Sequence, residues 1–322
     1  KCLKQRSGCT NKAIMKKIIQ DVFKYILGTA DFSLVTQSNS GFLYPICLNF
    51  TLENNRFYYN LLDDNGIPYR FYQSVGVQYN PTRIAAYGLA HFNRYIDKAF
   101  DNDKEIFMKC ANWFLDLDNA RYEYNFDWGQ LKSPWISCMA QGEAASVLIR
   151  AYKLTGEDKY LLQAEKSLTP LFLPITESGV QSVLPDGSIF LEEYPSLKPT
   201  HVLNGFLYAL IGLGEYIDVT GSNVHQDLFD KLVNSLCQNI SIWCYAGWSL
   251  YEDSVKAKGL NFCTPSYHNL QITQLKWLNK RVNNPDIQHV IEVWEKGLNS
   301  FLMRVFALLG KVCFRLKNKA QR

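Results

Sequence analysis

The sequence lacks the motifs that identify several large protein classes. Its nine cysteines include no C-x-x-C pair, and no histidines stand at zinc-ligand spacing beside them. This pattern argues against a zinc site and against a full disulfide framework. The sequence also contains no G-x-G-x-x-G motif and no phosphate-binding P-loop, the glycine patterns that hold dinucleotides and nucleoside triphosphates. We therefore predict no metal and no cofactor.

Long apolar runs are absent as well. No stretch reaches the length that crosses a bilayer, and the basic segment 1–20 has no apolar core of the kind that signal peptides contain. We therefore expect no transmembrane segment and a cytoplasmic location. A pairing of Cys2 with Cys9 stays open, and the glycosylation patterns at Asn49 and Asn239 matter only if the protein is secreted.

Net charge and aromatic content indicate which partners the protein could bind. The net charge of +4 is mild, so nucleic acid is not predicted as a partner, whereas an anionic polysaccharide is compatible with it. Apolar residues make up 47% of the 322 residues, as in globular proteins, and aromatic residues make up 14%. Two explanations of the aromatic residues remain open, a carbohydrate cleft in which rings stack on sugars and a helical core packed with large side chains.

The first 78 residues change pattern along their length. Residues 12–27 predict a helix with Ile14, Ile18, Val22 and Ile26 on one face. Short aromatic and β-branched runs follow, interrupted by turn residues, and they indicate hairpins and loops at 42–50, 56–61 and 69–72.

Beyond residue 79 the periodicity is helical. We predict successive helix pairs at 83–99 and 103–115, 137–153 and 158–168, 202–220 and 226–237, 268–280 and 286–301. Long loops rich in Tyr, Trp, Asp and Glu recur between the pairs, and the segment 205–214 is apolar on every side, as an inner helix must be.

These features predict a mainly α fold, an incomplete α/α toroid of about four helix pairs with a small N-terminal helix and β-hairpin region. We divide the chain into an N-terminal helix and hairpin region at 1–78, the toroid at 79–300, and a basic amphipathic helix at 301–322 that docks on the rest of the protein or lies on a membrane surface.

Three polar stretches lie in loops that such a fold gathers at one mouth. They are Leu191-Glu192-Glu193-Tyr194-Pro195, Trp248-Ser249-Leu250-Tyr251-Glu252-Asp253 and Ser266-Tyr267-His268-Asn269. Carboxylate, phenol and imidazole groups that converge on a cleft can exchange protons with a substrate. The spacing alone favours solvated loops, because Glu192-Glu193 before a helix also fits a surface turn.

Several ordered blocks carry a family resemblance. They are Gln78-Tyr79-Asn80-Pro81 with Ala86 to Phe92, Trp135 to Ala144, Glu192 to Pro195, Val202 to Phe206, and Tyr267-His268 with Gln271, Gln274 and Leu275. Together they resemble the C-terminal helical domain of D-glucuronyl C5-epimerase, the heparan sulfate and heparosan epimerase. The resemblance covers about 78–300. Where the family has Tyr-x-x-Arg, this chain has Tyr251-Glu252-Asp253-Ser254, so Lys256, Lys258 or Arg83 would have to meet the substrate's acidic group.

The resemblance implies an isomerase that inverts D-glucuronate to L-iduronate within a heparosan-like chain, without a redox cofactor. The family's paired acid and phenol align with Glu193 and Tyr194, and we assign Glu193 and Tyr267 to opposite faces of the sugar. Tyr194 and Tyr251 would hold the carboxylate or tune that pair, and Glu192 is expected to be structural. The expected substrate contacts are Tyr79, Arg83, Tyr87, Trp128, Trp135, Gln141, Asn204 and His268.

Some of these roles have plain alternatives. Trp135 fits core packing equally well, His268 is often a cap or a packed residue at a helix start, and Gln141 with Glu143 either points into the cleft or bonds neighbouring loops. Family members tend to be dimers, so a homodimer through the C-terminal helix is a further expectation. Two alternative functions remain, a polysaccharide lyase that shares the C5 proton abstraction and a non-catalytic toroid that binds acidic glycans.

Overall fold

The computed structural model describes residues 19–26, 28, 31–35, 42–98, 100–253 and 259–318. They fall into two compact units, one formed by residues 33–239 and the other by residues 1–32 with 240–322. The first is called the large unit below, and the second the small unit. Each is described by itself.

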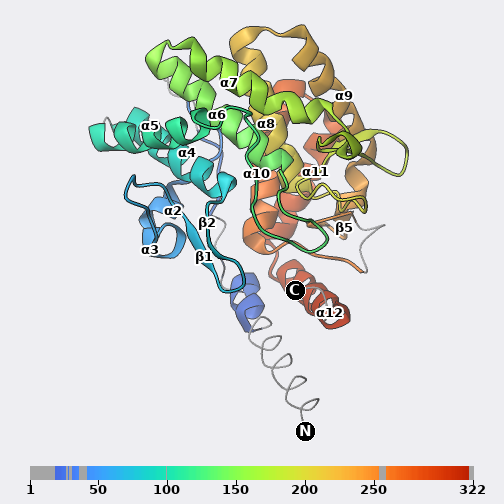
Figure 1. The fold of residues 1–322 in the computed structure, drawn as a ribbon. Coiled ribbons are helices and arrows are strands. Elements are labelled where there is room, and N and C mark those ends of the chain that lie inside the picture. The colour runs from blue at the N-terminus through green and yellow to red at the C-terminus, as the bar shows by residue number, and fades with distance from the viewer. Residues whose placement is uncertain are drawn as a thin grey trace. The chain divides into compact units, whose positions relative to one another are not determined.

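The large unit begins with short elements and continues with three helix pairs (Figure 1). Its helices are α2 (Asn49–Glu53), α3 (Asn55–Tyr58), α4 (Pro81–Lys98), α5 (Asp101–Leu115), α6 (Cys138–Thr155), α7 (Asp158–Leu168), α8 (Leu203–Thr220) and α9 (Asn223–Asn239). Its 3₁₀ helices are η1 (Thr169–Phe172) and η2 (Ile175–Glu177). Its strands are β1 (Arg70–Tyr72), β2 (Gly76–Gln78), β3 (Gln181–Val183) and β4 (Ile189–Leu191), which pair as two antiparallel hairpins, β1–β2 and β3–β4.

The pairing of these helices is that of an α/α toroid. α4, α6 and α8 contact one another in succession, while α5, α7 and α9 each pack on the preceding inner helix. Helix α8 is buried from Leu203 to Ile217 without a break, which confirms the prediction that the apolar segment 205–214 is an inner helix. The mainly helical, toroid-type fold is thereby confirmed.

Glycines set the distance between α6 and α8. A Cβ atom on Gly212 would lie 2.1 Å from the carbonyl oxygen of Gly142, and one on Gly142 would lie 2.6 Å from Cα of Ala209. Real side chains do not approach backbone so closely, so the two inner helices touch main chain to main chain at this point. This contact holds α6 against the middle of α8, about two turns beyond the helix start at Leu203.

The small unit holds the fourth helix pair. It contains the helical segment 19–26, η3 (Ile240–Trp243), the short hairpin β5 (Cys244–Tyr245) and β6 (Trp248–Ser249), and helices α10 (Pro265–Val282), α11 (Pro285–Asn299) and α12 (Phe301–Lys317). α10 packs on α11, and α11 and α12 meet at 92°. No single helix in the described part of the chain is long and apolar enough to cross a membrane. The bent pair α11–α12 taken together has sufficient length and apolar composition.

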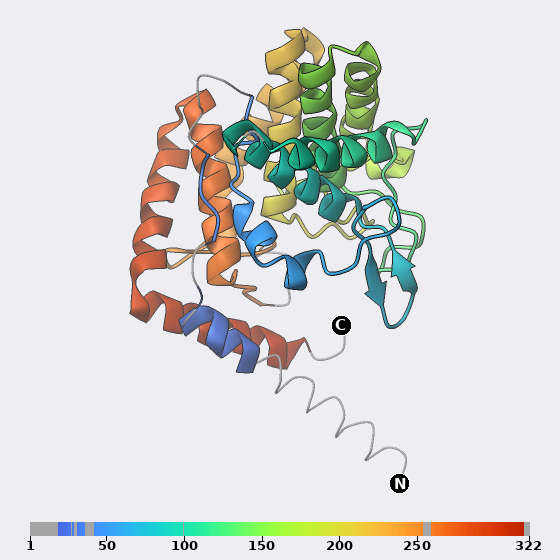
Figure 2. The ribbon, with the colours of Figure 1, turned by 90° about the vertical axis from the view of Figure 1, so that its left-hand side faces the viewer.

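Segment 19–26 lies along α12 (Figure 2), where Arg315 donates to Asp21 Oδ1 over 2.9 Å. The predicted apolar face is wrong here, because Val22 is exposed and Asp21 and Tyr25 are buried instead. Tyr25 donates its hydroxyl proton to the carbonyl oxygen of Phe262 over 3.0 Å. Two polar bonds therefore decide which side of the segment faces inward, and the earlier part of the predicted helix lies outside the described residues.

The expected hairpins and loops of the large unit are confirmed only in part. In the run 42–50, Ile46 pairs with Leu34 in an isolated antiparallel bridge before α2 begins at Asn49, and the run 69–72 enters a strand. The expectation is wrong where residues 55–58 form α3. α2 packs on α4, and Thr51 Oγ1 donates to the carbonyl oxygen of Leu48 over 2.7 Å. Tertiary packing and a local bond thus override the strand propensity of the aromatic residues. The nine principal helices from 81 to 317 follow the predicted positions closely.

Candidate active site

The stretch 191–194 is held between the β3–β4 hairpin and the start of α6. Glu192 N donates to the carbonyl oxygen of Val180 over 2.8 Å, and the carbonyl oxygen of Glu192 accepts from Cys138 N over 3.1 Å. The thiol of Cys138 also contacts the carbonyl oxygen of Leu191 at 3.5 Å. The backbone that carries both glutamates is therefore fixed to the first turn of an inner helix, where an accepting carbonyl satisfies one of the free N–H groups.

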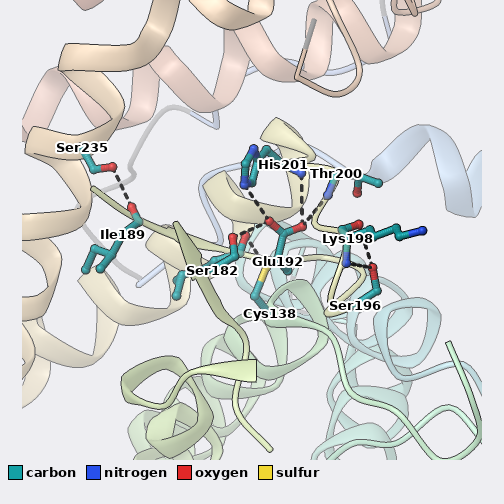
Figure 3. Close-up of polar contacts among 10 residues, drawn as sticks. Cys138, Ser182, Ile189, Glu192, Ser196, Lys198, Thr200, His201 and Ser235 are labelled. Atoms are coloured by element: carbon teal, nitrogen blue, oxygen red, sulfur yellow. Dashed lines mark hydrogen bonds and ion pairs between the residues drawn. The ribbon is translucent and has the colours of Figure 1, made fainter. Parts of the chain in front are cut away.

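Glu192 occupies a fully buried pocket of donors (Figure 3). Its oxygens accept from Ser182 Oγ at 2.6 Å, from His201 N at 3.2 Å and from Thr200 N at 3.3 Å. His201 Nε2 lies 3.4 Å from Oε1. Burial raises the pKa of Glu192, and His201 with these hydrogen bonds opposes the rise. A carboxylate so enclosed ties the hairpin to the start of α8, as the structural role predicted for Glu192 requires.

Glu193 faces the first turn of helix α8. Its side chain is only 8% exposed, and Asn204 Nδ2 donates to its Oε2 at 3.4 Å. Gly205 on α8 makes the room, because a Cβ atom there would lie 2.6 Å from both Cβ and Oε2 of Glu193. The sequence analysis predicted Asn204 as a sugar contact, so neither its bond to Glu193 nor the role of Gly205 was predicted. A buried carboxylate with an amide donor is suited to proton transfer.

A second buried carboxyl group lies close to Glu193. Glu143 on α6 is 1% exposed, and its Oε2 has no hydrogen-bond partner among the described residues. Burial, followed by the charge of Glu193, raises the pKa of Glu143 well above its usual value. Burial chiefly raises the pKa of the Tyr124 phenol, and both carboxylates add to the rise. Glu143 was not among our assigned site residues, although we left open that it points into the cleft with Gln141. An acidic residue on a buried inner helix is the signal that marks it.

Aromatic rings surround this part of the large unit. Trp135 stacks on Tyr124 with centroids 4.2 Å apart, and the Tyr194 ring lies 6.0 Å from Trp135. Trp135 is 8% exposed, and its indole nitrogen donates to the carbonyl oxygen of Phe126 over 2.8 Å, which agrees with the core-packing alternative. Trp128 is 52% exposed. Trp128 is therefore the more available of the two indoles for a sugar face.

The substrate contacts predicted around the start of α4 differ in how deeply they are buried. Tyr87 is buried, with its ring 4.6 Å from that of Tyr59. Tyr79 is partly exposed and donates its hydroxyl proton to Asp63 Oδ2 over 2.7 Å, which raises the pKa of Tyr79 to about 12. Arg83 lies with its guanidinium 5.2 Å from the centroid of Tyr59, and its buried Nε has no partner among the described residues.

Gln141 is enclosed by loops. Its amide nitrogen donates to the carbonyl oxygens of Ala120 at 2.8 Å and Ser167 at 2.7 Å, and its oxygen accepts from Tyr122 N at 2.9 Å. The side chain is 0% exposed. Of the two alternatives for Gln141, the structure shows the one in which it bonds neighbouring loops, and no donor remains for a sugar.

The small unit brings two of the predicted phenols together. Tyr251 and Tyr267 have ring centroids 5.8 Å apart in an edge arrangement. Tyr267 stands in the first turn of α10 and is 43% exposed. Thr264 caps this helix by accepting from Tyr267 N at 3.4 Å. The helix start and its cap fix the backbone of Tyr267 while its ring reaches solvent, which suits a group that meets a polymeric substrate.

His268 takes the packed role that we considered as its alternative. Its Nδ1 lies 2.8 Å from Ser249 Oγ, its Nε2 lies 3.0 Å from the carbonyl oxygen of Trp294, and its ring stacks on Trp248 at 4.0 Å. The residue is 0% exposed, and burial lowers the pKa of His268 to about 3. It is therefore neutral at physiological pH and has no ring nitrogen left for a substrate.

Other expectations meet the limits of the described chain. Cys2, Cys9, Ser254, Lys256 and Lys258 lie outside the described residues. Asn239 is 8% exposed, and its amide donates to Asp186, Ser188 and the carbonyl oxygen of Ser235, so the glycosylation pattern there is not an available acceptor. No group of three or more His, Cys, Asp or Glu side chains suited to a metal ion occurs within the described ranges.

Comparison with known sequences locates this geometry in a family. A family model described as D-glucuronyl C5-epimerase C-terminus matches residues 115–296. The chain is 34% identical over 194 residues to D-glucuronyl C5-epimerase of Caenorhabditis elegans, covering 53% of this chain and 31% of that protein. It is 24% identical over 179 residues to an uncharacterized protein of Methanocaldococcus jannaschii, covering 55% of this chain and 56% of that one. These matches thus span about a third to a half of each relative's length.

Solved structures share the fold at low identity. Cellobiose 2-epimerase from Bacillus thermoamylovorans aligns with a TM-score of 0.54 at 8% identity, over 76% of this chain and 67% of that chain. A family 76 glycoside hydrolase from a bovine Bacteroides thetaiotaomicron strain aligns with a TM-score of 0.51 at 10% identity, over 93% of this chain and 77% of that chain. At these identities the likeness concerns the fold alone.

Proposed function

This chain belongs to the D-glucuronyl C5-epimerase family, and we propose that it inverts D-glucuronate to L-iduronate within a heparosan-like polysaccharide. The observation that carries the proposal is the buried Glu193 carboxylate, which Asn204 holds and for which Gly205 leaves room. A carboxylate placed in this way can act as a base and take a proton from carbon in a site that excludes water.

The reaction requires a base and an acid on opposite faces of the sugar. The C5–H bond is weakly acidic, and its electrons move into the adjacent carboxylate as the proton leaves, so that carboxylate must be hydrogen-bonded or neutralised. We assign the proton at C5 of glucuronate to Glu193 Oε and the returning proton to the Tyr267 hydroxyl. The C5–H bond breaks on one face and a new C5–H bond forms on the other, and the two groups exchange roles in the reverse reaction.

The remaining residues hold the substrate in this proposal. Tyr194 and Tyr251 bind the carboxylate or tune the acid–base pair, and Lys256, Lys258 or Arg83 supplies a cation in place of the family arginine that Ser254 replaces. The sugar contacts are Tyr79, Trp128 and Asn204, with Trp135 and Tyr87 packed behind them. The burial of Gln141 and His268 assigns them to the support of loops and of α10 in place of substrate contact.

Isotope exchange tests the proposal and separates it from its alternatives. In deuterated water, the epimerase should place deuterium at C5 of heparosan without shortening the chain. A lyase would instead shorten the chain and produce the ultraviolet absorbance of an unsaturated uronate. A non-catalytic binder would retain heparosan with no exchange, and this binding would survive the double change Glu193→Gln with Tyr267→Phe. Either of the last two outcomes would contradict the epimerase.

We further propose that two copies associate through α12. Its exposed face carries a stripe with alternating spacings of four and three residues, as in a coiled-coil seam, made of Leu302, Phe306, Leu309, Cys313 and Leu316. Such a stripe is self-complementary, so a second copy is its simplest partner. Sedimentation should show a dimer that Leu309→Glu dissociates and Leu162→Glu does not, since both leucines are similarly exposed, at 60% and 57%. A dimer that survives Leu309→Glu would contradict this interface.

A further inference from the structure

The seam between α6 and α8 brings two acidic side chains together in the large unit. Glu193 is fixed on one side by the bond from Cys138 N to the Glu192 carbonyl, and on the other by its contact with Gly205. Gly205 and Ala209 are one turn apart on α8, and Ala209 is where Gly142 touches that helix. Glu143 directly follows Gly142. The backbone contacts therefore place both carboxyl groups beside the same two turns of α8.

Glu143 has surroundings that do not support a negative charge. It is 1% exposed, and its Oε2 has no hydrogen-bond partner among the described residues. An ionised carboxylate buried in this way costs several kcal/mol unless a cation or donors compensate it. The neutral acid form avoids that cost, because its hydroxyl is a hydrogen-bond donor and it carries no charge.

The titratable neighbours of Glu143 add no compensating cation. The phenols of Tyr44, Tyr59 and Tyr124 lie within reach of its charge, and each has a pKa raised chiefly by burial. The hydroxyl of Tyr44 is itself buried without a partner among the described residues. The nearby Arg150 binds Glu215 through two bonds of 2.8 and 2.6 Å, and Arg83 stacks on Tyr59. The remaining ionised neighbour is the Glu193 carboxylate.

We propose that Glu143 is a positioning residue that remains protonated and shares one proton with Glu193, so that the base of this enzyme is a carboxyl–carboxylate pair. The proposal rests on the epimerase function for its catalytic meaning. Two adjacent carboxyl groups in a dry site cannot both ionise, and the first proton is lost from the better solvated and better bonded member. That member is Glu193, because it is the more exposed of the two and accepts from Asn204. The neutral Glu143 then stabilises the Glu193 anion as its hydrogen-bond donor.

The pH dependence of the exchange rate tests this role with two variants. Glu143→Gln keeps the shape, neutrality and donor of the protonated acid, so the rate should stay within about threefold of wild type and the acidic limb of the profile should not move. Glu143→Leu removes the donor, so the acidic limb should move up by about one pH unit. A structural role alone would lower the amount of folded protein without moving the limb. If Glu143 is ionised instead, Glu143→Gln should move the limb down, and this outcome would overturn the proposal.

A spectroscopic measurement decides the pairing independently of activity. With glutamate labelled at the side-chain carboxyl carbon, the ¹³C spectrum at pH 7 should show one protonated carboxyl resonance. It should disappear in Glu143→Gln and persist in Glu193→Gln. Absence of this resonance from the wild type would overturn the pair even if epimerisation is found. Its presence in a protein without isotope exchange would keep the pair and reject the proposed reaction, so the two failures are distinguishable.

Discussion

In each unit a short hairpin precedes an inner helix, and the two arrangements differ in how deeply they bury the predicted site residues. In the large unit the hairpin β3–β4 precedes inner helix α8, and in the small unit the hairpin β5–β6 precedes α10. Each connection carries predicted site residues. Glu193, in the first connection, is 8% exposed, whereas Tyr267, in the first turn of α10 just after the second connection, is 43% exposed. The acid therefore depends on helix packing for its position, and the phenol depends only on the start of its helix.

This difference determines which substitutions can disturb each group. Glu193 depends on the bond from Asn204 and on the space that Gly205 leaves. Tyr267 has the Tyr251 ring as a neighbour. Changes at Glu193 and its support should alter both rate and pH dependence, while changes at Tyr267 should alter the rate alone.

The largest expected effect among the supporting variants is at Tyr267. In the proposed reaction the Tyr267 hydroxyl returns the proton to C5, so we expect Tyr267→Phe to lower the epimerisation rate by about 10²- to 10⁴-fold. Tyr245→Phe is the control, because Tyr245 lies in the same unit and is similarly exposed at 45%. Proton NMR of the iduronate signal measures both. Equal rates for the two variants would remove Tyr267 from the reaction.

A smaller loss is expected when Glu193 is displaced without being changed. Gly205→Ala places a Cβ atom 2.6 Å from the Glu193 carboxylate, and a shift of about 1 Å in a catalytic group costs about 100-fold in rate. Gly212→Ala on the same helix meets the Gly142 backbone instead, so it should lower the melting temperature. If Gly205→Ala is fully active, Glu193 is not confined as described.

Glu192 should separate stability from catalysis. Glu192→Gln puts an amide donor among the donors Ser182, Thr200 and His201, and an unmatched buried donor costs about 1–3 kcal/mol of unfolding free energy. The rate per folded molecule should remain within a few-fold of wild type. Urea unfolding followed by circular dichroism measures the first quantity. A large rate loss at unchanged stability would give Glu192 the catalytic role that we assign to its neighbour.

His268 should make the small unit sensitive to acid. Its pKa is about 3 when folded and about 6.5 when unfolded, so the unfolded chain takes up a proton below pH 6.5 that the folded chain refuses. Stability is therefore full above pH 6.5, and about 2 kcal/mol of unfolding free energy is lost between pH 7.5 and pH 5. His268→Gln should reduce this pH slope, and the exposed His289→Gln should leave it unchanged. Identical slopes for wild type and His268→Gln would contradict the assignment.

Sequence periodicity was a sufficient guide to the helices but a poor one to the first 78 residues. Helices α4 to α12 are long enough for a 3.6-residue pattern to repeat several times. The runs 49–53 and 55–58 are too short for this, and packing on α4 decides them. Segment 19–26 has its orientation set by the contacts of Asp21 and Tyr25 with residues 237 or more positions away, which no local pattern can reveal.

The candidate site was predictable where a motif marks it. Glu193, Tyr194 and Tyr267 came from family blocks, and the structure places Glu193 in a buried, hydrogen-bonded position. Gln141 and His268 came from the same blocks, but their bonds go to the protein itself, because a polar residue inside a helical core must find partners there. The contact of Gly205 with Glu193 depends on tertiary packing, so no local pattern reveals it. For Glu143 the sequence left two roles open, and its burial without a partner for Oε2 among the described residues became visible only in three dimensions.

The most direct test of the central claim follows deuterium out of heparosan labelled at C5 of glucuronate. Wild-type protein should release the label to water and form L-iduronate at matching rates. Glu193→Gln should slow both processes by about 10²- to 10⁴-fold. The exposed Glu177→Gln should behave as wild type, and all three proteins should melt at similar temperatures. Release of the label by Glu193→Gln at the wild-type rate would contradict the assignment of Glu193 as the base.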